Sequence, residues 1–222
     1  MATRDHVRDG IVVYPEIVKG NPLGAKRVVR WLLNRPGYIM GNPMKAGHDD
    51  YIVAWSRILD PTKPILNLQI SDDGLFNPLA LPSKEGELVY LGKGDPKARR
   101  PEIDNGRIEV TKSWPTTHVE LANLLRHSKV IYSYDTLSGV NYEATLCGTL
   151  CVIIPNGPYT KDDIGRGELG LNGIAWGTDP YEIQRAIHTL PDAYTTYLKV
   201  LEQQGESVLA FVQATQERWS MR

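Results

Sequence analysis

The sequence predicts an α/β protein, with a Rossmann-like parallel sheet that carries helices on both faces and a reduced N-terminal lobe before it. Short apolar segments alternate with segments of helical pattern from about residue 84 to about residue 190, as they do in repeated βαβ units. Leu150–Ile154 is a nearly continuous apolar run, which is typical of a parallel strand buried on both faces. These observations place a doubly wound sheet in the C-terminal part of the chain.

Strands are expected where short apolar or β-branched runs lie between turn residues. The runs of this kind are 11–14, 51–55, 65–70, 87–91, 108–111, 129–133, 150–154 and 173–176. Helices are expected where apolar residues recur at helical spacing, at 25–33, 117–127, 142–146, 179–190 and 193–219, with a break in the last at Gly205. The polar, glycine-rich segment 156–172 is expected to be a loop.

Two of the expected helices begin with recognisable capping residues. Thr117 is followed three residues later by Glu120, which is the spacing of a capping box. Asp179 stands at a cap position with Pro180 in the first turn, where proline is tolerated because its missing N–H would be unbonded anyway. Both helix starts are therefore predicted from local chemistry as well as from periodicity.

Composition and charge limit the function classes. The chain has 222 residues, of which 41% are hydrophobic and 23% charged, which is ordinary for a globular protein. A net charge of −1 gives no overall basic field for nucleic acid. Cys147 and Cys151 are too few for a zinc site and are expected to be buried small hydrophobes. Because no signal peptide or membrane span is legible, we expect a cytoplasmic protein and leave peripheral membrane association open.

Two carboxylates bracket one loop of the predicted sheet. Asp135 follows a strand and Glu143 lies early in the next helix, with seven residues between them. Ligands of open α/β sheets bind at the carboxyl ends of the strands, so we expect both acids to face one crevice. Ionised carboxylates there can accept hydrogen bonds from a polyhydroxylated ligand. The arrangement favours a sugar-nucleotide site.

The surrounding sequence resembles a known family. The pattern KVIYSYD, seven residues, then EATLCGTLCVIIP at 129–155 resembles the C-terminal domain of GT-B glycosyltransferases, above all the retaining family with a Glu-x7-Glu motif. Asp135 replaces the first Glu of that motif and is one methylene shorter. The stretch IVVYPEIVKGNPLGAKRVVRWLLNRPG at 11–37 resembles bacterial polysaccharide and O-antigen glycosyltransferases. The resemblance implies a GT-B-like architecture.

The resemblance also implies roles for individual residues. Glu143 would hold the ribose hydroxyls of a nucleotide diphosphate sugar and Asp135 the transferred sugar, so these two are the expected catalytic residues. A cation after the first strand would neutralise the diphosphate leaving group. Amides at the helix entrance near Gly139 could bind the same group. The expected donor-binding residues are Gly92, Lys93, Arg99, Arg100, Ser138, Gly139 and Glu143.

The acceptor side is less defined in the sequence. His48, Asp49 and Asp50 form an acidic and histidine-containing cluster in the N-terminal part, and they are candidates for an acceptor-side site. A loop that caps a neighbouring element is the alternative explanation. Tyr90, Trp114 and Tyr134 lie at or beyond strand ends, where one of them could stack on the nucleobase or serve as core.

The domain boundaries follow from Pro61 and Pro64, which mark a linker. We expect a reduced acceptor-side lobe at 1–64, a nucleotide-sugar-binding domain at 65–205 and, by the resemblance, a C-terminal helix at 206–222 that packs back on the first lobe. A complete GT-B enzyme needs two full lobes, and the N-terminal part has room for about two strands and one helix. A partner subunit or a homo-oligomer that completes the cleft is therefore an open alternative.

The expected function is a glycosyltransferase that uses a nucleotide diphosphate sugar as co-substrate and retains anomeric configuration. No Asp-x-Asp motif is present to tie a metal to the donor, so neither a metal nor another cofactor is expected. The acceptor can be a saccharide, a lipid-linked glycan or, less in keeping with the net charge, a nucleic acid. The alternatives are a non-catalytic nucleotide-sugar-binding module, one subunit of a split transferase and a sugar-nucleotide epimerase-like enzyme.

Overall fold

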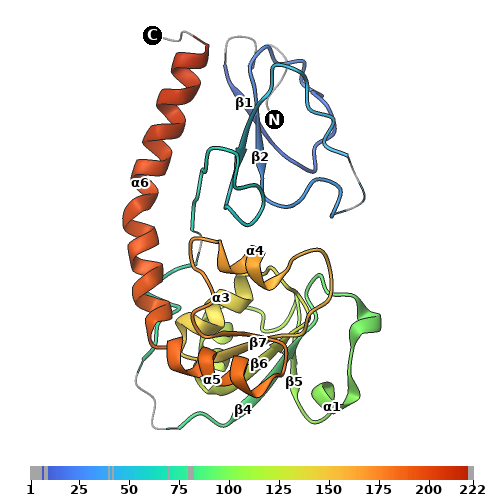
Figure 1. Ribbon diagram of the computed structural model, residues 1–222, viewed down its shortest axis with the longest axis vertical. Helices are drawn as coiled ribbons and strands as arrows, with labels where there is room; N and C mark the ends of the chain where they lie inside the picture. The colour runs from blue at the N-terminus through green and yellow to red at the C-terminus, as the bar shows by residue number, and fades with distance from the viewer. Residues whose placement is uncertain are drawn as a thin grey trace. The chain divides into compact units, whose positions relative to one another are not determined.

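The computed structural model describes residues 7, 10–39, 41, 43–69, 71–79 and 83–219. Internal contacts divide the chain into two compact units, each of which is drawn in Figure 1. The first consists of Met1–Gln69 with Glu202–Arg222, and the second is Ile70–Leu201. The divisions predicted after residues 64 and 205 lie near these points, and the segment predicted to return to the N-terminal lobe falls in the first unit.

The described part of the first unit holds a parallel three-stranded sheet in the order β1-β2-β3. Its strands are β1 (Val12–Pro15), β2 (Val28–Leu32) and β3 (Tyr51–Ala54). The helix predicted at 25–33 is wrong, because this segment contains β2. Val28 and Val29 are both buried, one toward each face of the sheet, and β-branched residues suit such a strand. A short apolar run satisfies helical and strand patterns alike, and here the neighbouring strands decided the outcome.

The strand predicted at 65–70 is also wrong, and residue 70 itself lies outside the described residues. Only an isolated parallel bridge joins Ile65 to β3. The next amides find other partners: the N–H of Asn67 donates to the Ser207 hydroxyl at 3.1 Å, in the C-terminal helix. Side chains therefore take the place of a neighbouring strand and satisfy this backbone.

The described residues of the second unit form a parallel five-stranded sheet in the order β5-β4-β6-β7-β8. Its strands are β4 (Gly86–Tyr90), β5 (Ile108–Val110), β6 (Ser128–Ser133), β7 (Leu150–Ile153) and β8 (Ile174–Trp176). The chain moves from β4 outward to β5 and then returns to the other side of β4 with β6. That reversal creates a switch point, and the carboxyl ends of the strands beside it form the usual crevice of such sheets.

Helices cover both faces of this sheet (Figure 1). The helices of this unit are η2 (Pro96–Ala98), α1 (Pro101–Asp104), α2 (His118–Arg126), α3 (Gly139–Leu146), α4 (Lys161–Gly165), α5 (Pro180–Thr189) and the first turns of α6 (Asp192–Arg218). Ile103 of α1 and Ala186 of α5 pack on the face that contains Val89 and Val152. On the other side α3 contacts β6 and β7, and α2 packs beside α3. The α/β class and the parallel sheet are thus confirmed.

Helix starts follow the predicted chemistry. The Thr117 side chain accepts from the Glu120 amide while Glu120 caps the helix entrance in return, which is a complete capping box. Asp179 accepts from the amides of Tyr181 and Glu182 at the start of α5. The two cysteines are free and buried, as expected.

Two helix predictions need correction. The segment 156–172 contains α4, which begins with a capping box of Thr160 and Asp163 that the glycine-rich composition concealed. The predicted break at Gly205 is absent, and α6 is continuous. Glycine costs about 1 kcal/mol in a helix. Tertiary packing offsets this cost, because Phe211 and Trp219 pack against the core of the first unit.

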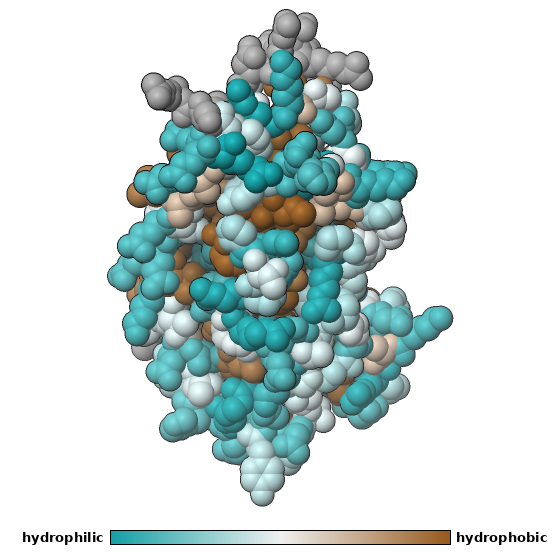
Figure 2. All heavy atoms as spheres, turned by 45° about the horizontal axis from the view of Figure 1, so that its top comes forward, coloured by the Kyte–Doolittle hydropathy of each residue, from teal (hydrophilic) through white to brown (hydrophobic). Residues whose placement is uncertain are grey.

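Figure 2 shows a face on which hydrophilic side chains dominate and hydrophobic ones gather in smaller groups. Among the described residues, no helix combines the length and the apolar composition that crossing a bilayer requires.

Candidate functional site

A pocket of about 330 Å³ lies at the switch point of the second unit's sheet. Its walls come from the carboxyl ends of β4 and β5 and from the entrances of α2 and α3. The lining residues that matter below are Tyr90, Lys112, His118, Ser138, Gly139 and Glu143. The volume lies at the lower end of the range for small-molecule sites. Of the residues predicted for the site, the structure brings Ser138, Gly139 and Glu143 to this pocket.

Glu143 lies in the second turn of α3 and is half-buried. Its Oε1 atom accepts a hydrogen bond from the Ser71 hydroxyl at 3.1 Å. Burial raises the pKa of the Glu143 carboxyl above its ordinary value, while the Ser71 hydrogen bond and the charge of His118 oppose the shift. A carboxylate with a perturbed pKa on a pocket wall is a functional-site candidate.

The raised pKa of Glu143 predicts a pH-dependent affinity for ligands that donate hydroxyl groups. The ionised carboxylate is the better acceptor, so affinity is complete above the raised pKa and is lost as the pH falls through it. Dissociation constants for a nucleoside, measured from about pH 8 down to about pH 4, check this expectation, because a nucleoside has no phosphate that would itself gain a proton in this range. Glu143→Gln should give a flat profile, whereas His118→Gln should keep the acid loss. A flat profile in the wild-type protein contradicts the assignment.

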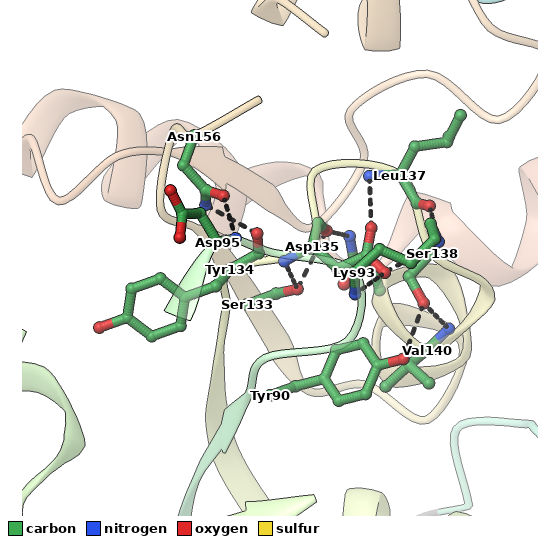
Figure 3. Close-up of polar contacts among 11 residues, drawn as sticks. Tyr90, Lys93, Asp95, Ser133, Tyr134, Asp135, Leu137, Ser138, Val140 and Asn156 are labelled. Atoms are coloured by element: carbon green, nitrogen blue, oxygen red, sulfur yellow. Dashed lines mark hydrogen bonds and ion pairs between the residues drawn. The ribbon is translucent and has the colours of Figure 1, made fainter. Parts of the chain in front are cut away.

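The entrance of α3 is built from Ser138 and Gly139. Ser138 is the N-cap, and its hydroxyl accepts from the Val140 amide at 3.4 Å. The same hydroxyl donates to the phenolic oxygen of Tyr90 at 3.5 Å, as Figure 3 shows. The first amides of α3 therefore lie at the pocket with the positive end of the helix dipole, which favours negatively charged groups.

Asp135 has a different position from the one that the resemblance implies. Its carboxylate is 1% exposed and accepts from the Lys93 amide at 3.0 Å, from Lys93 Nζ at 2.8 Å and from the Leu137 amide at 3.2 Å (Figure 3). Lys93 Nζ also donates to the Leu137 carbonyl oxygen at 2.8 Å. Asp135 thus joins the loops that follow β4 and β6, and neither it nor Lys93 is among the residues that line the pocket.

Gly92 makes this connection possible. Its φ of 55° lies in the left-handed region, and a Cβ atom at this position would stand 2.5 Å from Asp135 Oδ2. Any other residue would push the β4 loop away from the carboxylate. The contribution of Gly92 is therefore the close approach of two loops.

The predicted arginines are not brought to the pocket. Arg99 forms ion pairs with Asp104, at 3.2 Å, and with Glu109. The Arg100 amide donates to the hydroxyl of Tyr134 at 2.9 Å. These contacts hold the η2 and α1 region against the sheet, and the Arg99 side chain has structural partners here.

Lys112 and His118 line the pocket and were not among the predicted site residues. Lys112 follows β5, so the rule that ligands bind at the carboxyl ends of strands could have indicated it. His118 is the first residue of α2, directly after the capping threonine. Its proximity to Glu143 depends on the packing of α2 beside α3, which no local pattern reveals.

The side chains of the acceptor-side cluster, His48, Asp49 and Asp50, do not form one site in the first unit. The side chains of His48 and Asp49 are 99% and 95% exposed, and they contact each other at 3.0 Å. Asp50 instead pairs at 2.7 Å with Arg30, whose side chain is fully buried. The Arg30 guanidinium also lies over the ring of Tyr14. Asp50 therefore stabilises the core of this unit, and an acceptor role for His48 and Asp49 stays a prediction.

No protein-family model matches this chain, and a search among curated proteins gives no significant match. Within the residues that the structure describes, no group of three or more His, Cys, Asp or Glu side chains forms a possible metal site. The functional argument consequently depends on the pocket, its position in the sheet and the residues that line it.

Proposed function

We propose that this chain is a glycosyltransferase that binds a nucleotide diphosphate sugar in the pocket between β4, β5, α2 and α3. The observation that carries the proposal is the presence of Glu143 and the entrance of α3 in one pocket at the switch point of a parallel sheet. The Glu143 carboxylate supplies an acceptor for hydroxyl groups, and the amides at the α3 entrance supply donors for an anion. A nucleoside diphosphate needs both.

In this proposal Glu143 accepts hydrogen bonds from the ribose hydroxyls, with the strength of a charge-assisted pair. The amides of α3 and the Ser138 hydroxyl meet the diphosphate. During transfer the bond from the anomeric carbon to the diphosphate oxygen breaks and a bond from that carbon to the acceptor's hydroxyl oxygen forms. The acceptor's proton passes to the departing diphosphate, on which negative charge develops. The helix entrance and the ammonium of Lys112, which lines the pocket, stabilise that charge, which gives a reason why a metal is not required. The GT-B assignment and retention of configuration are proposed from the sequence resemblance.

Turnover of sugar nucleotides tests the proposal. We expect the protein to release nucleoside diphosphate slowly from one member of a panel of UDP-, GDP-, dTDP- and ADP-sugars, because water can replace an absent acceptor. Glu143→Ala should lower this release by about tenfold or more, since a hydrogen bond to a charged group contributes about 1.5–3 kcal/mol. Glu102→Ala, an exposed glutamate of α1, should release at the wild-type rate. No release by wild type from any member of the panel contradicts catalysis, and equal release by wild type and Glu143→Ala contradicts the role of Glu143.

One observation favours a second candidate function, a non-catalytic nucleotide-sugar-binding module or one subunit of a split transferase. Asp135, the residue that the resemblance assigns to the transferred sugar, is buried and occupied by Lys93 and Leu137. Binding of a nucleoside diphosphate without any donor turnover would support this candidate. Turnover that appears only with a second protein would support the split enzyme.

A further inference from the structure

Tyr90 is a buried tyrosine whose hydroxyl is poorly bonded. It is the last residue of β4, is 7% exposed and lines the pocket. Within the described part of the chain, its phenolic oxygen has a single hydrogen bond, accepted from Ser138 Oγ at 3.5 Å. Hydroxyl–hydroxyl bonds normally have lengths of about 2.7–2.8 Å, so this contact is weak. The phenolic proton itself has no acceptor there.

A buried donor without an acceptor is costly, and folded proteins seldom leave one. Tyr90 belongs to a pocket wall, so a bound molecule can supply the missing acceptor. Successive side chains of a strand point to opposite faces of the sheet. Tyr132 on β6, which pairs with Val89, packs on the face opposite to Tyr90 and does not line the pocket. The position of Tyr90 therefore directs its hydroxyl toward a ligand.

The neighbours of Tyr90 indicate which kind of acceptor fits. The Ser138 hydroxyl caps the Val140 amide at only 3.4 Å, so the α3 entrance is weakly capped. The entrance of α2 is different, because the Glu120 carboxylate already accepts from the amides of Thr116 and Thr117 at 3.0 and 3.1 Å. Hydroxyl and amide donors thus gather at the α3 end of the pocket, where a negatively charged oxygen is the favoured partner.

We propose that the Tyr90 hydroxyl is a ligand-binding group that donates a hydrogen bond to a phosphate oxygen of the bound nucleoside diphosphate. The inference rests on the proposed function and specifies how its pocket holds the anionic part of the donor. Glu143, as an acceptor, takes the hydroxyl groups of the same molecule. The ligand is therefore oriented with its phosphates at Tyr90 and Ser138 and its ribose at Glu143.

The protonation state of Tyr90 agrees with a donor role. Burial raises the pKa of its phenol, and the charges of Asp135 and Glu143 raise it further, while the Ser138 contact lowers it in part. The hydroxyl consequently keeps its proton at neutral pH and cannot become a competing anion beside the phosphate.

Tyr90→Phe tests the inference, since it removes the hydroxyl and keeps the ring. Calorimetric titrations would compare UDP, GDP, dTDP and ADP with uridine, guanosine, thymidine and adenosine. Tyr90→Phe is expected to weaken the diphosphate that binds wild type by about tenfold or more, and the matching nucleoside by less than about twofold. Tyr132→Phe, the same change on the opposite face of the sheet, should alter neither affinity.

Equal weakening of diphosphate and nucleoside would overturn the inference, because the phenol would then contact the nucleoside. Unchanged diphosphate affinity would also overturn it, while leaving the proposed function intact. If wild type binds none of the four diphosphates, the proposed function fails as well.

Should Tyr90→Phe prove unstable, 3-fluorotyrosine at position 90 offers a more acidic donor. It is expected to tighten diphosphate binding, and an unchanged affinity would count against the inference.

Discussion

Replacing Asp135 by alanine is expected to destabilise the second unit by about 3 kcal/mol or more. The carboxylate is 1% exposed and holds Lys93 through two hydrogen bonds, with a third from the Leu137 amide. Without it, the Lys93 ammonium, on a side chain that is 28% exposed, keeps the Leu137 carbonyl as its partner among the described residues. The Lys93 amide and the Lys93 ammonium then lose their acceptor together. Removing one partner of an ion pair is costly because the remaining groups stay in the protein without an acceptor.

Urea unfolding of Asp135→Ala, followed by the fluorescence of the tryptophans, measures this loss as a change in the unfolding free energy. Glu102→Ala is the matched control, because its side chain is exposed, and it should stay within about 0.5 kcal/mol of wild type. Asp135→Asn should fall between the two, since an amide keeps the shape but not the charge. A loss below about 1 kcal/mol for Asp135→Ala would show that the carboxylate is not needed to join the two loops.

The second large effect concerns binding. Glu143→Ala is expected to weaken the preferred nucleoside diphosphate by about a hundredfold, because a carboxylate that accepts two ribose hydroxyls contributes about 3 kcal/mol. Glu143→Gln keeps one acceptor oxygen and should lose less. Stability without ligand should change little, since burial already disfavours the charged form of this side chain.

Calorimetry on the two variants and on Glu182→Gln separates this role from a general charge effect. Glu182 pairs with Lys161 and Arg185 outside the pocket, so its variant should bind like wild type. Wild-type affinity in Glu143→Ala would contradict the proposed contact between Glu143 and the ribose, even if nucleotides still bind elsewhere in the second unit.

Much of the second unit could be predicted from the sequence because its signals are local. Capping residues such as Thr117 and Asp179 define helix starts within one turn. The apolar run at 150–154 defines a buried strand. The helix predicted at 25–33 was wrong because a short apolar run fits both the helical and the strand period. Only pairing with the neighbouring strands selects one of them. The helix α4 was not predicted because the glycine-rich composition of 156–172 favoured a loop, although the capping residues of α4 are present in the sequence.

The site was predictable to the same extent. Ser138 and Glu143 were found because they follow a strand end and a helix start, where open sheets bind ligands. Lys112 and His118 reach the pocket through the packing of other elements, which spacing along the chain does not encode. The burial of Asp135 depends on the close approach of the loop at Gly92, a contact across two strands of the sheet. Such a contact decides whether a carboxylate meets a ligand or another side chain.

The most direct test of the central claim is a thermal-shift panel of UDP, GDP, dTDP, ADP and CMP on wild type and Glu143→Ala. At a concentration about 100 times the dissociation constant, a ligand that binds only the folded protein stabilises it by about 2.7 kcal/mol. We predict that one diphosphate raises the melting temperature of wild type clearly and that of Glu143→Ala little or not at all. If no nucleotide shifts wild type, or if both proteins shift equally, the pocket beside Glu143 is not a nucleotide site.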